Sequence, residues 1–261
     1  MIPGAALITG AGIRVGRAMA LDLAEQGWDV AVHYNSSSDP AEEVAARIRK
    51  LGRRAAAIQA DLLDPEAVDA LVPRASEALG RRLSLLVNNA SIFEYDRVGK
   101  LTASGWDRAM GSNLRAPVFL TQAFAEQAPE AERDANDEPV ASAAVINLID
   151  MRVRKLTPEF TSYTLAKMGL WAFTRTAAQA LAPHVRVNAI GPGPTLQGGR
   201  QSAEQFARQR ASTLLGRGTS PEELTQAVRY LLAADGVTGQ LICVDGGQHL
   251  AWQTPDILGL E

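Results

Sequence analysis

An aspartate, a tyrosine and a lysine in this chain have the types and spacing needed for acid–base chemistry. Asp150 ends an apolar segment, and Tyr163 and Lys167 follow with the spacing Tyr-x-x-x-Lys. Residues four apart share one face of a helix, so the Lys167 ammonium can lower the pKa of the Tyr163 phenol for proton transfer. The alternative is an ordinary amphipathic helix, because apolar residues recur at helical spacing over 160–181. A nucleotide site elsewhere in the chain would favour the acid–base interpretation.

A glycine-rich turn near the amino end predicts such a site. The turn spans Thr9 to Gly16, after an apolar strand-like segment and before a helical one. Glycine allows close backbone approach, and the first amides of a helix offer hydrogen-bond donors and partial positive charge to a pyrophosphate. A turn that merely joins strand to helix is the alternative, which this context disfavours. We expect the dinucleotide to contact Gly10, Gly12, Ile13, Arg14, Val15 and Gly16.

The end of the second expected strand indicates which nicotinamide cofactor fits. NAD-specific sites usually carry an acidic residue there, whereas this chain has Tyr34, Asn35 and Ser36. Asp39 comes later, directly before a proline, where we expect it to cap the next helix. These neutral hydrogen-bond donors would tolerate an adenosine 2′-phosphate, and the nearby Arg14 would partly neutralise its charge. NADPH is therefore favoured over NADH.

Composition limits the possible partners. The formal net charge is −3, from 26 basic and 29 acidic residues, which disfavours a nucleic-acid partner. Cys243 is the single cysteine, and His33, His184 and His249 are scattered, so neither an intramolecular disulfide nor a metal site is expected. The chain shows neither a secretory leader nor an apolar run of membrane-spanning length. We expect a cytoplasmic protein that acts on a small molecule, with no membrane partner.

Strand-like and helical segments alternate along the chain without a break. The strand-like segments lack polar alternation, which is typical of a parallel sheet covered by helices on both faces. This predicts one α/β domain over 1–261. The expected strands are 5–9, 29–33, 55–59, 83–88, 143–148, 185–190 and 241–244, and the expected helices are 15–26, 40–51, 65–79, 106–127, 160–181 and 221–233.

Two segments interrupt this alternation. Residues 127–142 are polar and acidic, which predicts an exposed loop to which we assign no function. Glycines and prolines dominate the start of the segment 192–210, which follows the carboxyl end of a strand. Open α/β sheets bind ligands at that end, so we expect a substrate lid over 194–215.

Several motifs, in order and at compatible spacing, resemble those of the short-chain dehydrogenase/reductase family over essentially the whole chain. They are Thr9–Gly16, Asp61-Leu62, Asn88-Asn89-Ala90, Asn113, Tyr163-x-x-x-Lys167 and Asn188–Gly193. The resemblance implies a single Rossmann-like domain with a doubly wound, seven-stranded parallel sheet, hydride transfer and commonly a homotetramer. It also implies cofactor contacts from Asp61, Leu62, Asn89, Ala90, Lys167, Pro192 and Gly193.

Within that family the chain looks most like the pteridine reductases and dihydromonapterin reductases. Like them, it has Arg14 where most relatives have a second glycine and Asp150 where most have a catalytic serine. Ser91 and Phe93 fit the pattern in which a serine and an aromatic residue contact a pterin. This implies substrate contacts from Arg14, Ser91, Phe93, Asp150 and Tyr163. The alternatives are that Phe93 fills core, that Ser91 caps a turn and that Asp150 terminates a strand.

The predicted function is NADPH-dependent reduction of a C=N bond in a pterin or related heterocycle. Such a reaction requires a proton on ring nitrogen, for which a partly desolvated carboxylic acid is suited. We expect Lys167 to hold the nicotinamide ribose, and Tyr163 to pass the proton to the substrate. We expect Asp150 either to act as the proton source of Tyr163 or to donate directly, and Asn113 to position a water behind Lys167. A carbonyl or alcohol dehydrogenase is the first alternative. A non-catalytic dinucleotide sensor is the second, although a sensor has no need for an acid–base set.

Overall fold

Seven parallel strands form the centre of the molecule in the computed structural model, which describes residues 1–254. Their order across the sheet is β3–β2–β1–β4–β7–β8–β9, as the doubly wound Rossmann-like prediction requires. Each predicted strand is present, with bounds that differ by two residues at most. The strands are β1 (Ala5–Ile8), β2 (Asp29–Tyr34), β3 (Ala55–Gln59), β4 (Leu85–Asn88), β7 (Ala143–Leu148), β8 (Val185–Pro192) and β9 (Leu241–Val244).

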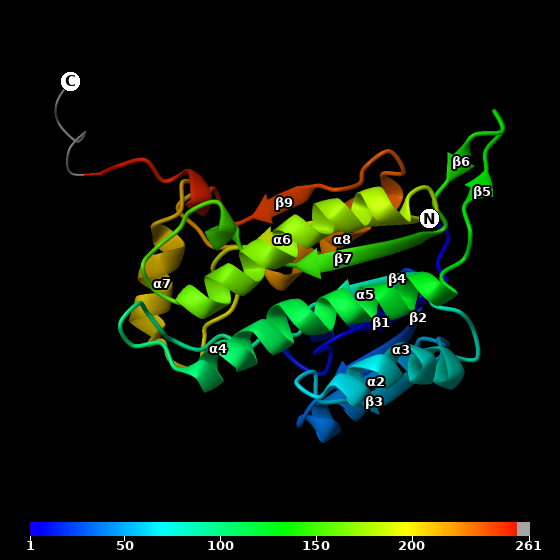
Figure 1. Ribbon diagram of the computed structural model, residues 1–261, viewed down its shortest axis with the longest axis horizontal. Helices are drawn as coiled ribbons and strands as arrows, with labels where there is room; N and C mark the ends of the chain where they lie inside the picture. The colour runs from blue at the N-terminus through cyan, green and yellow to red at the C-terminus, as the bar shows by residue number, and fades with distance from the viewer. Residues whose placement is uncertain (255–261) are drawn as a thin grey trace.

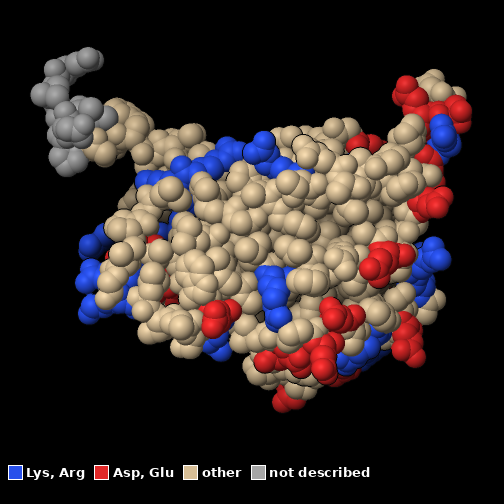
Figure 2. Space-filling model, in the orientation of Figure 1, with Lys and Arg blue, Asp and Glu red and all other residues tan. Residues whose placement is uncertain are grey.

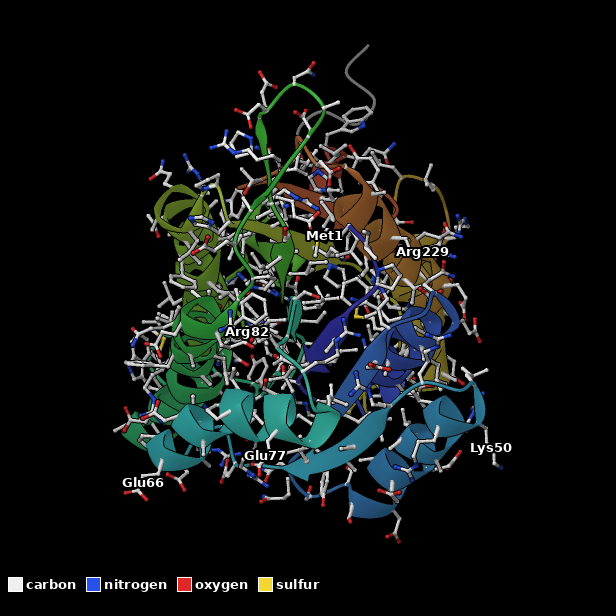
Figure 3. The ribbon with its side chains drawn as sticks, turned by 90° about the vertical axis from the view of Figure 1, so that its right-hand side faces the viewer. Met1, Lys50, Glu66, Glu77, Arg82 and Arg229 are labelled. Atoms are coloured by element: carbon white, nitrogen blue, oxygen red, sulfur yellow. The ribbon has the colours of Figure 1, made fainter. Side chains whose placement is uncertain are left out.

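Helices cover both faces of the sheet, which Figure 3 shows in a view along the strands. One face packs against α1 (Arg14–Glu25), α2 (Ser38–Lys50) and α8 (Pro221–Ala233). The other packs against α3 (Pro65–Leu79), α5 (Ala116–Gln127) and α6 (Thr161–Leu181). Charged side chains such as Lys50, Glu66 and Glu77 lie on the outer surfaces of these helices.

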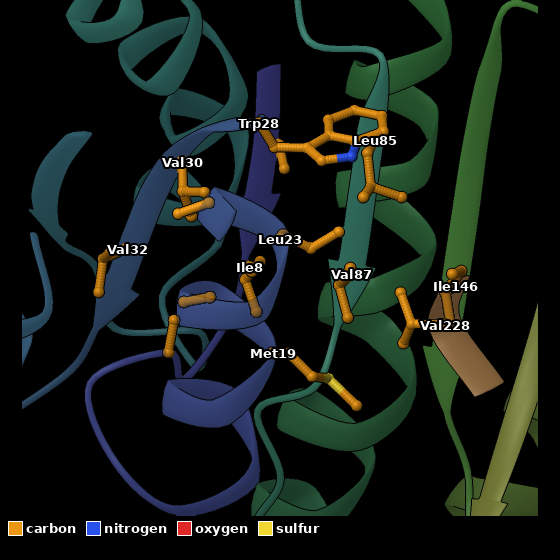
Figure 4. Close-up of a cluster of buried hydrophobic side chains, with 14 of the residues drawn as sticks. Ile8, Met19, Leu23, Trp28, Val30, Val32, Leu85, Val87, Ile146 and Val228 are labelled. Carbon is orange, nitrogen blue, oxygen red and sulfur yellow. The ribbon is translucent and has the colours of Figure 1, made fainter. Parts of the chain in front are cut away.

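Alternation along the strands explains why they carry apolar residues at successive positions. Successive side chains point to opposite faces of a sheet. Ile8 therefore joins the apolar cluster beneath α1 and α8, seen in Figure 4, whereas Leu7 joins the cluster beneath α3 and α5. Val87 and Leu86 divide in the same way. Both faces are thus buried, which fixes the register and places all strand ends at common edges.

Three local features differ from the prediction. The helix expected at 106–127 begins earlier, as α4 (Ala103–Met110), and passes through a π-turn (Gly111–Arg115) into α5. The loop expected at 127–142 contains a short antiparallel pair, β5 (Glu132–Arg133) and β6 (Pro139–Val140). Asp39 is not an N-cap, because α2 starts one residue before it; its carboxylate lies in the first turn, where it favours the helix dipole.

The carboxyl ends of the strands meet at the end of the molecule where α7 (Ala203–Ala211) lies, at the left in Figure 1. Two short 3₁₀ turns, Met151–Val153 and Gln248–Leu250, also lie at this edge. The segment expected to be a lid runs from the end of β8 across this edge into α7. Within residues 1–254, none of the helices has the length and apolar character needed to cross a membrane.

Candidate active site

A cavity of about 1220 Å³ opens at the carboxyl edge of the sheet. Its walls come from the turn after β1, the ends of β2, β4, β7 and β8, the start of α6 and the lid segment. All sixteen residues predicted to contact the cofactor line this cavity, and so do all five predicted to contact the substrate. The fold therefore brings both predicted sets into one site.

The glycine turn is held in place by three side chains. The backbone N–H of Gly10, which has φ +64°, donates to His33 Nδ1 at 3.0 Å. Asn89 Nδ2 donates to the carbonyls of Thr9 and Gly10 at 2.8 and 3.2 Å. Thr9 Oγ1 accepts from the backbone N–H groups of Asn89 and Ala90. The turn is thus tied to β2 and β4 as well as to its own helix.

Close packing inside the turn explains its final glycine. A Cβ atom at Gly16 would lie 2.2 Å from the carbonyl oxygen of Gly10. Arg14 itself has φ +54°, a left-handed conformation that glycine adopts more easily. Arginine at this position therefore costs backbone strain that glycine would avoid. This strain is expected where the guanidinium group itself has a function.

His33 supports the turn as a neutral imidazole. Its ring is 1% exposed, its Nδ1 accepts from Gly10, and its Nε2 lies 3.1 Å from the carbonyl of Ala60. Since Nδ1 is an acceptor, Nε2 carries the hydrogen and donates to Ala60. Burial lowers the pKa of His33 from 6.5 to about 4. The histidine therefore braces the turn in its uncharged form.

The wall beside the end of β2 consists of the neutral side chains of Tyr34, Asn35 and Ser36. Asn35 is held through its carbonyl by Gln59 Nε2 at 3.3 Å. Asp61, at the end of β3, uses Oδ1 to accept from the backbone N–H of Leu63. The wall is uncharged at the position where an acidic residue would select against a 2′-phosphate.

Asp150, Tyr163 and Lys167 come together at the centre of the cavity, as predicted. The Tyr163 hydroxyl donates to Asp150 Oδ2 at 3.0 Å, and Lys167 Nζ donates to the carbonyl of Leu148 at 2.7 Å. Asp150 Oδ1 accepts from the backbone N–H of Arg152 at 2.8 Å. Asp150 therefore caps the turn after β7 and bonds the tyrosine at the same time, while its role as proton source stays a prediction.

The expected lowering of the Tyr163 pKa by Lys167 is wrong. Burial and the negative charge of Asp150 raise the pKa of Tyr163 well above 10. Burial also raises the pKa of Asp150, and lowers that of Lys167 from 10.5 to about 8. The phenol is therefore protonated at neutral pH and acts as a proton donor, with a carboxyl group of raised pKa directly behind it.

Asn113 does not line the cavity. It is fully buried in the π-turn, where its Nδ2 donates to the carbonyl of Ile92 and its Oδ1 accepts from Ser91 Oγ and the backbone N–H of Ile92. These contacts fix the chain after β4, which carries Ser91 and Phe93. Its predicted role in positioning a water behind Lys167 stays a prediction.

An aromatic wall stands next to Tyr163. Phe93 meets the Tyr163 ring edge-on at 4.7 Å and stacks on Phe160 at 4.3 Å, with ring planes 8° apart. Tyr95 packs against the edge of Phe160 at 5.2 Å. Phe93 is 45% exposed, so it does not fill core, which removes the alternative considered for it. Phe160 therefore covers one face of Phe93, and the exposed part of the Phe93 ring borders the cavity.

Two arginines connect the lid to the rest of the site. Arg14 reaches across the cavity and donates to the lid carbonyls of Leu196 and Gln197 at 3.1 and 2.8 Å. Arg200, on the lid, donates to the carbonyl of Phe93. The guanidinium of Arg14 is thus turned to the lid rather than to the neutral wall after β2, where we expected it to help neutralise a phosphate.

Sequence reasoning missed Arg152, Phe160 and Arg200, which also line the cavity. Arg152 and Phe160 lie close in sequence to Asp150 and Tyr163, and this proximity is the signal that could have found them. Arg200 had no such signal, because it follows a run of glycines in the lid. His33 was treated as one of several scattered histidines, although its place at the end of β2 puts it beside the glycine turn.

Comparisons with known proteins agree with this geometry. Residues 10–249 match the family described as enoyl-(acyl carrier protein) reductase. A crystal structure of FolM alternative dihydrofolate reductase 1 from Brucella suis in complex with NADP is 46% identical, with a TM-score of 0.91, over 98% of this chain and all of that one.

Two sequence relatives act on other substrates. The L-rhamnose 1-dehydrogenase (NAD(P)(+)) of a Sphingomonas strain is 32% identical over 95% of this chain and 96% of its own length. The 3-oxoacyl-[acyl-carrier-protein] reductase FabG of Staphylococcus aureus is 31% identical over 94% of this chain and 98% of its own.

Proposed function

The chain belongs to the short-chain dehydrogenase/reductase family of oxidoreductases, and we propose that it is an NADPH-dependent reductase of a C=N bond in a pterin or related nitrogen heterocycle. The observation that carries this proposal is the 3.0 Å hydrogen bond from the Tyr163 hydroxyl to Asp150. It couples the proton donor of the site to a carboxyl group of raised pKa. The likeness to the Brucella reductase supports the same substrate class.

The residues present fit a phosphorylated dinucleotide. The packing of Gly16 against Gly10 leaves no room for a side chain, which keeps the turn open to a pyrophosphate at the start of α1. The neutral wall of Tyr34, Asn35 and Ser36 accepts a 2′-phosphate without repulsion. The Brucella suis structure holds NADP, which supports NADPH as the cofactor of this chain.

NADPH supplies the hydride when bound; the chain supplies the proton. Tyr163 gives its phenolic proton to the ring nitrogen as the adjacent carbon gains the hydride. Solvent then delivers a proton to Asp150, which is partly exposed to the cavity, and Asp150 passes it to the Tyr163 phenolate along their hydrogen bond. Lys167, buried near both, offsets the negative charge that this transfer leaves on Asp150. The exposed part of the Phe93 ring contacts the flat ring.

Oxidation of NADPH with a panel of substrates tests the proposal. The panel contains dihydrobiopterin, dihydromonapterin and dihydrofolate, with small ketones and sugars beside them. We expect turnover of the pterins and little of the ketones. Preferred turnover of ketones or sugars would instead select the carbonyl or alcohol dehydrogenase, which the rhamnose dehydrogenase and FabG likenesses favour. Cofactor binding with no turnover at all would select the sensor.

We further propose that the protein is a homotetramer acting on a small molecule in the cytoplasm. Apolar side chains on neighbouring helices support self-association: Phe119 on α5 is 45% exposed, and Leu165 and Met168 on α6 are 45% and 36% exposed. Figure 2 shows few charges on the face over these helices. Light scattering of the purified protein tests the subunit number, and a monomer would contradict it.

A further inference from the structure

Two arginines that line the cavity form no ion pair within residues 1–254, although the charge of Arg152 acts on the nearby Asp150. Arg152 and Arg200 line the cavity, and neither takes part in an ion pair. Arg108, which lines the same cavity, is paired with Glu94 at 3.0 Å. Arg14, the fourth arginine of the lining, forms no ion pair either but uses two guanidinium nitrogens on the carbonyls of Leu196 and Gln197. Arg152 and Arg200 each use a single guanidinium nitrogen and are therefore the cations most available to a ligand.

Both guanidinium groups lie beside the same aromatic ring. The guanidinium carbon of Arg152 is 5.1 Å from the centre of the Phe160 ring, and that of Arg200 is 5.9 Å from it. Arg200 is also 5.7 Å from the centre of Phe93. A ligand that packs on Phe160 is therefore within reach of both cations, which come from different elements, the turn after β7 and the lid.

Arg152 is incompletely satisfied. Its Nη1 donates to Thr157 Oγ1 at 2.5 Å, but its buried Nε has no hydrogen-bond partner. A buried donor without a partner costs free energy unless a ligand supplies an acceptor. Arg200 is exposed and uses one nitrogen on the carbonyl of Phe93. Its remaining donors are exposed and available to a ligand.

Phe93 links Tyr163 to the ring that both arginines contact. Tyr163 contacts Phe93 at 4.7 Å, and Phe93 stacks on Phe160 at 4.3 Å. The two arginines lie beside this second ring. A substrate ring held at Tyr163 would therefore need an arm about one aromatic ring long before an anionic group could meet the guanidinium pair.

We propose that Arg152 and Arg200 bind the carboxylates of a substrate whose heterocycle carries an aromatic arm ending in a dicarboxylate, as in dihydrofolate. This inference rests on the proposed function and narrows its substrate class. Guanidinium groups bind carboxylates through paired, charge-assisted hydrogen bonds. The arm packs against Phe160, and its carboxylates satisfy the open donors of both arginines. Pterins with short uncharged side chains would leave the pair unused.

The test compares kcat/KM for dihydrofolate and dihydrobiopterin, which share the reacting ring. In the wild type we expect dihydrofolate to be preferred. Arg200→Gln and Arg152→Gln should each lower the ratio of the two kcat/KM values by about 10- to 100-fold, the range for a lost hydrogen bond to a charged group. Arg208→Gln, on the exposed surface of α7 and outside the cavity lining, is the matched control and should leave the ratio unchanged.

Two outcomes overturn the inference, and they are distinguishable. If dihydrobiopterin is reduced but the ratio is the same in the wild type, Arg200→Gln and Arg152→Gln, the arginine pair does not recognise the arm, while the proposed function stands. If neither pterin is reduced by the wild type, the proposed function itself fails. Binding of NADPH, followed by its fluorescence, confirms that each variant is folded.

Discussion

The two ends of the cavity are built differently. At the cofactor end, the glycine turn is fixed by part-buried hydrogen bonds from or to His33, Asn89 and Thr9. At the substrate end, the segment 196–200 is joined to the rest of the site by Arg14 and Arg200, in exposed hydrogen bonds to carbonyls. One end is thus preorganised, whereas the other is joined by contacts that a ligand can replace. This difference is what we expect if residues 194–215 act as the predicted substrate lid beside a fixed cofactor site.

The largest expected effect comes from the residue between the two ends. Tyr163→Phe removes the proton donor but keeps the ring that contacts Phe93. We expect kcat to fall about 100- to 10,000-fold, the usual contribution of general acid catalysis. The Kd for NADPH, measured by titration calorimetry, should stay within about twofold of the wild-type value. The lost hydroxyl acts on the chemical step, which lowers kcat without weakening cofactor binding. Loss of both would show that the variant is misfolded and that Tyr163 supports the cofactor end.

The next effect tests how rigidly the cofactor end is built. The pKa of His33 is 6.5 in its unfolded state and about 4 in the folded protein. The unfolded chain therefore binds more protons between these pH values. The stability contributed by neutral His33 is complete above pH 6.5 and is lost as the pH falls toward 4, on the order of 3 kcal/mol.

Urea unfolding at pH 7.0, 6.0, 5.0 and 4.5 measures this loss. The free energy of unfolding of His33→Gln should be lower than that of the wild type at pH 7, and the difference should shrink as the pH falls. His184→Gln removes an exposed histidine and is the control, with the slope of the wild type. A His33→Gln curve parallel to that of the wild type would mean that His33 does not brace the turn through its neutral form.

The smallest effect concerns the lid. Arg14→Met removes the two hydrogen bonds to Leu196 and Gln197. Because these bonds are exposed, we expect the free energy of unfolding to change by less than about 1 kcal/mol. Limited proteolysis within 195–201 should nevertheless become faster, while Arg47→Met, an exposed arginine on α2, should leave it unchanged. A loss of stability as large as that of His33→Gln would mean that the two ends are equally integrated into the fold.

The cofactor end of the cavity could be predicted from the sequence more fully than the substrate end. The strands and the cofactor contacts follow from local patterns, because buried parallel strands are apolar throughout and the phosphate turn needs glycine at fixed positions. Asp150 and Tyr163 were predicted from their spacing along the chain. The site around Phe160 was not, because it forms only when the turn after β7, the start of α6 and the lid meet in space. The π-turn at Asn113 depends likewise on contacts with Ile92.

The pKa of Tyr163 shows where spacing misleads. Tyr163 and Lys167 do share a helix face, but Lys167 donates to the carbonyl of Leu148, and its nitrogen is 5.7 Å from the centre of the Tyr163 ring. The carboxylate of Asp150 is in direct contact with the phenol and outweighs the ammonium. Burial is the largest cause of the raised pKa and the adjacent Asp150 is the next, and the sequence contains neither the burial of the phenol nor its distance to Asp150.

The most direct test of the account is NADPH oxidation by Asp150→Ser with dihydrobiopterin, beside a small ketone. Serine keeps a hydroxyl next to Tyr163 but cannot supply a proton as a carboxylic acid does. We predict that kcat/KM for dihydrobiopterin falls at least about 100-fold, while any ketone turnover is kept or improved. Reduction of dihydrobiopterin at the wild-type rate would contradict the account, because Tyr163 would then obtain its proton without Asp150.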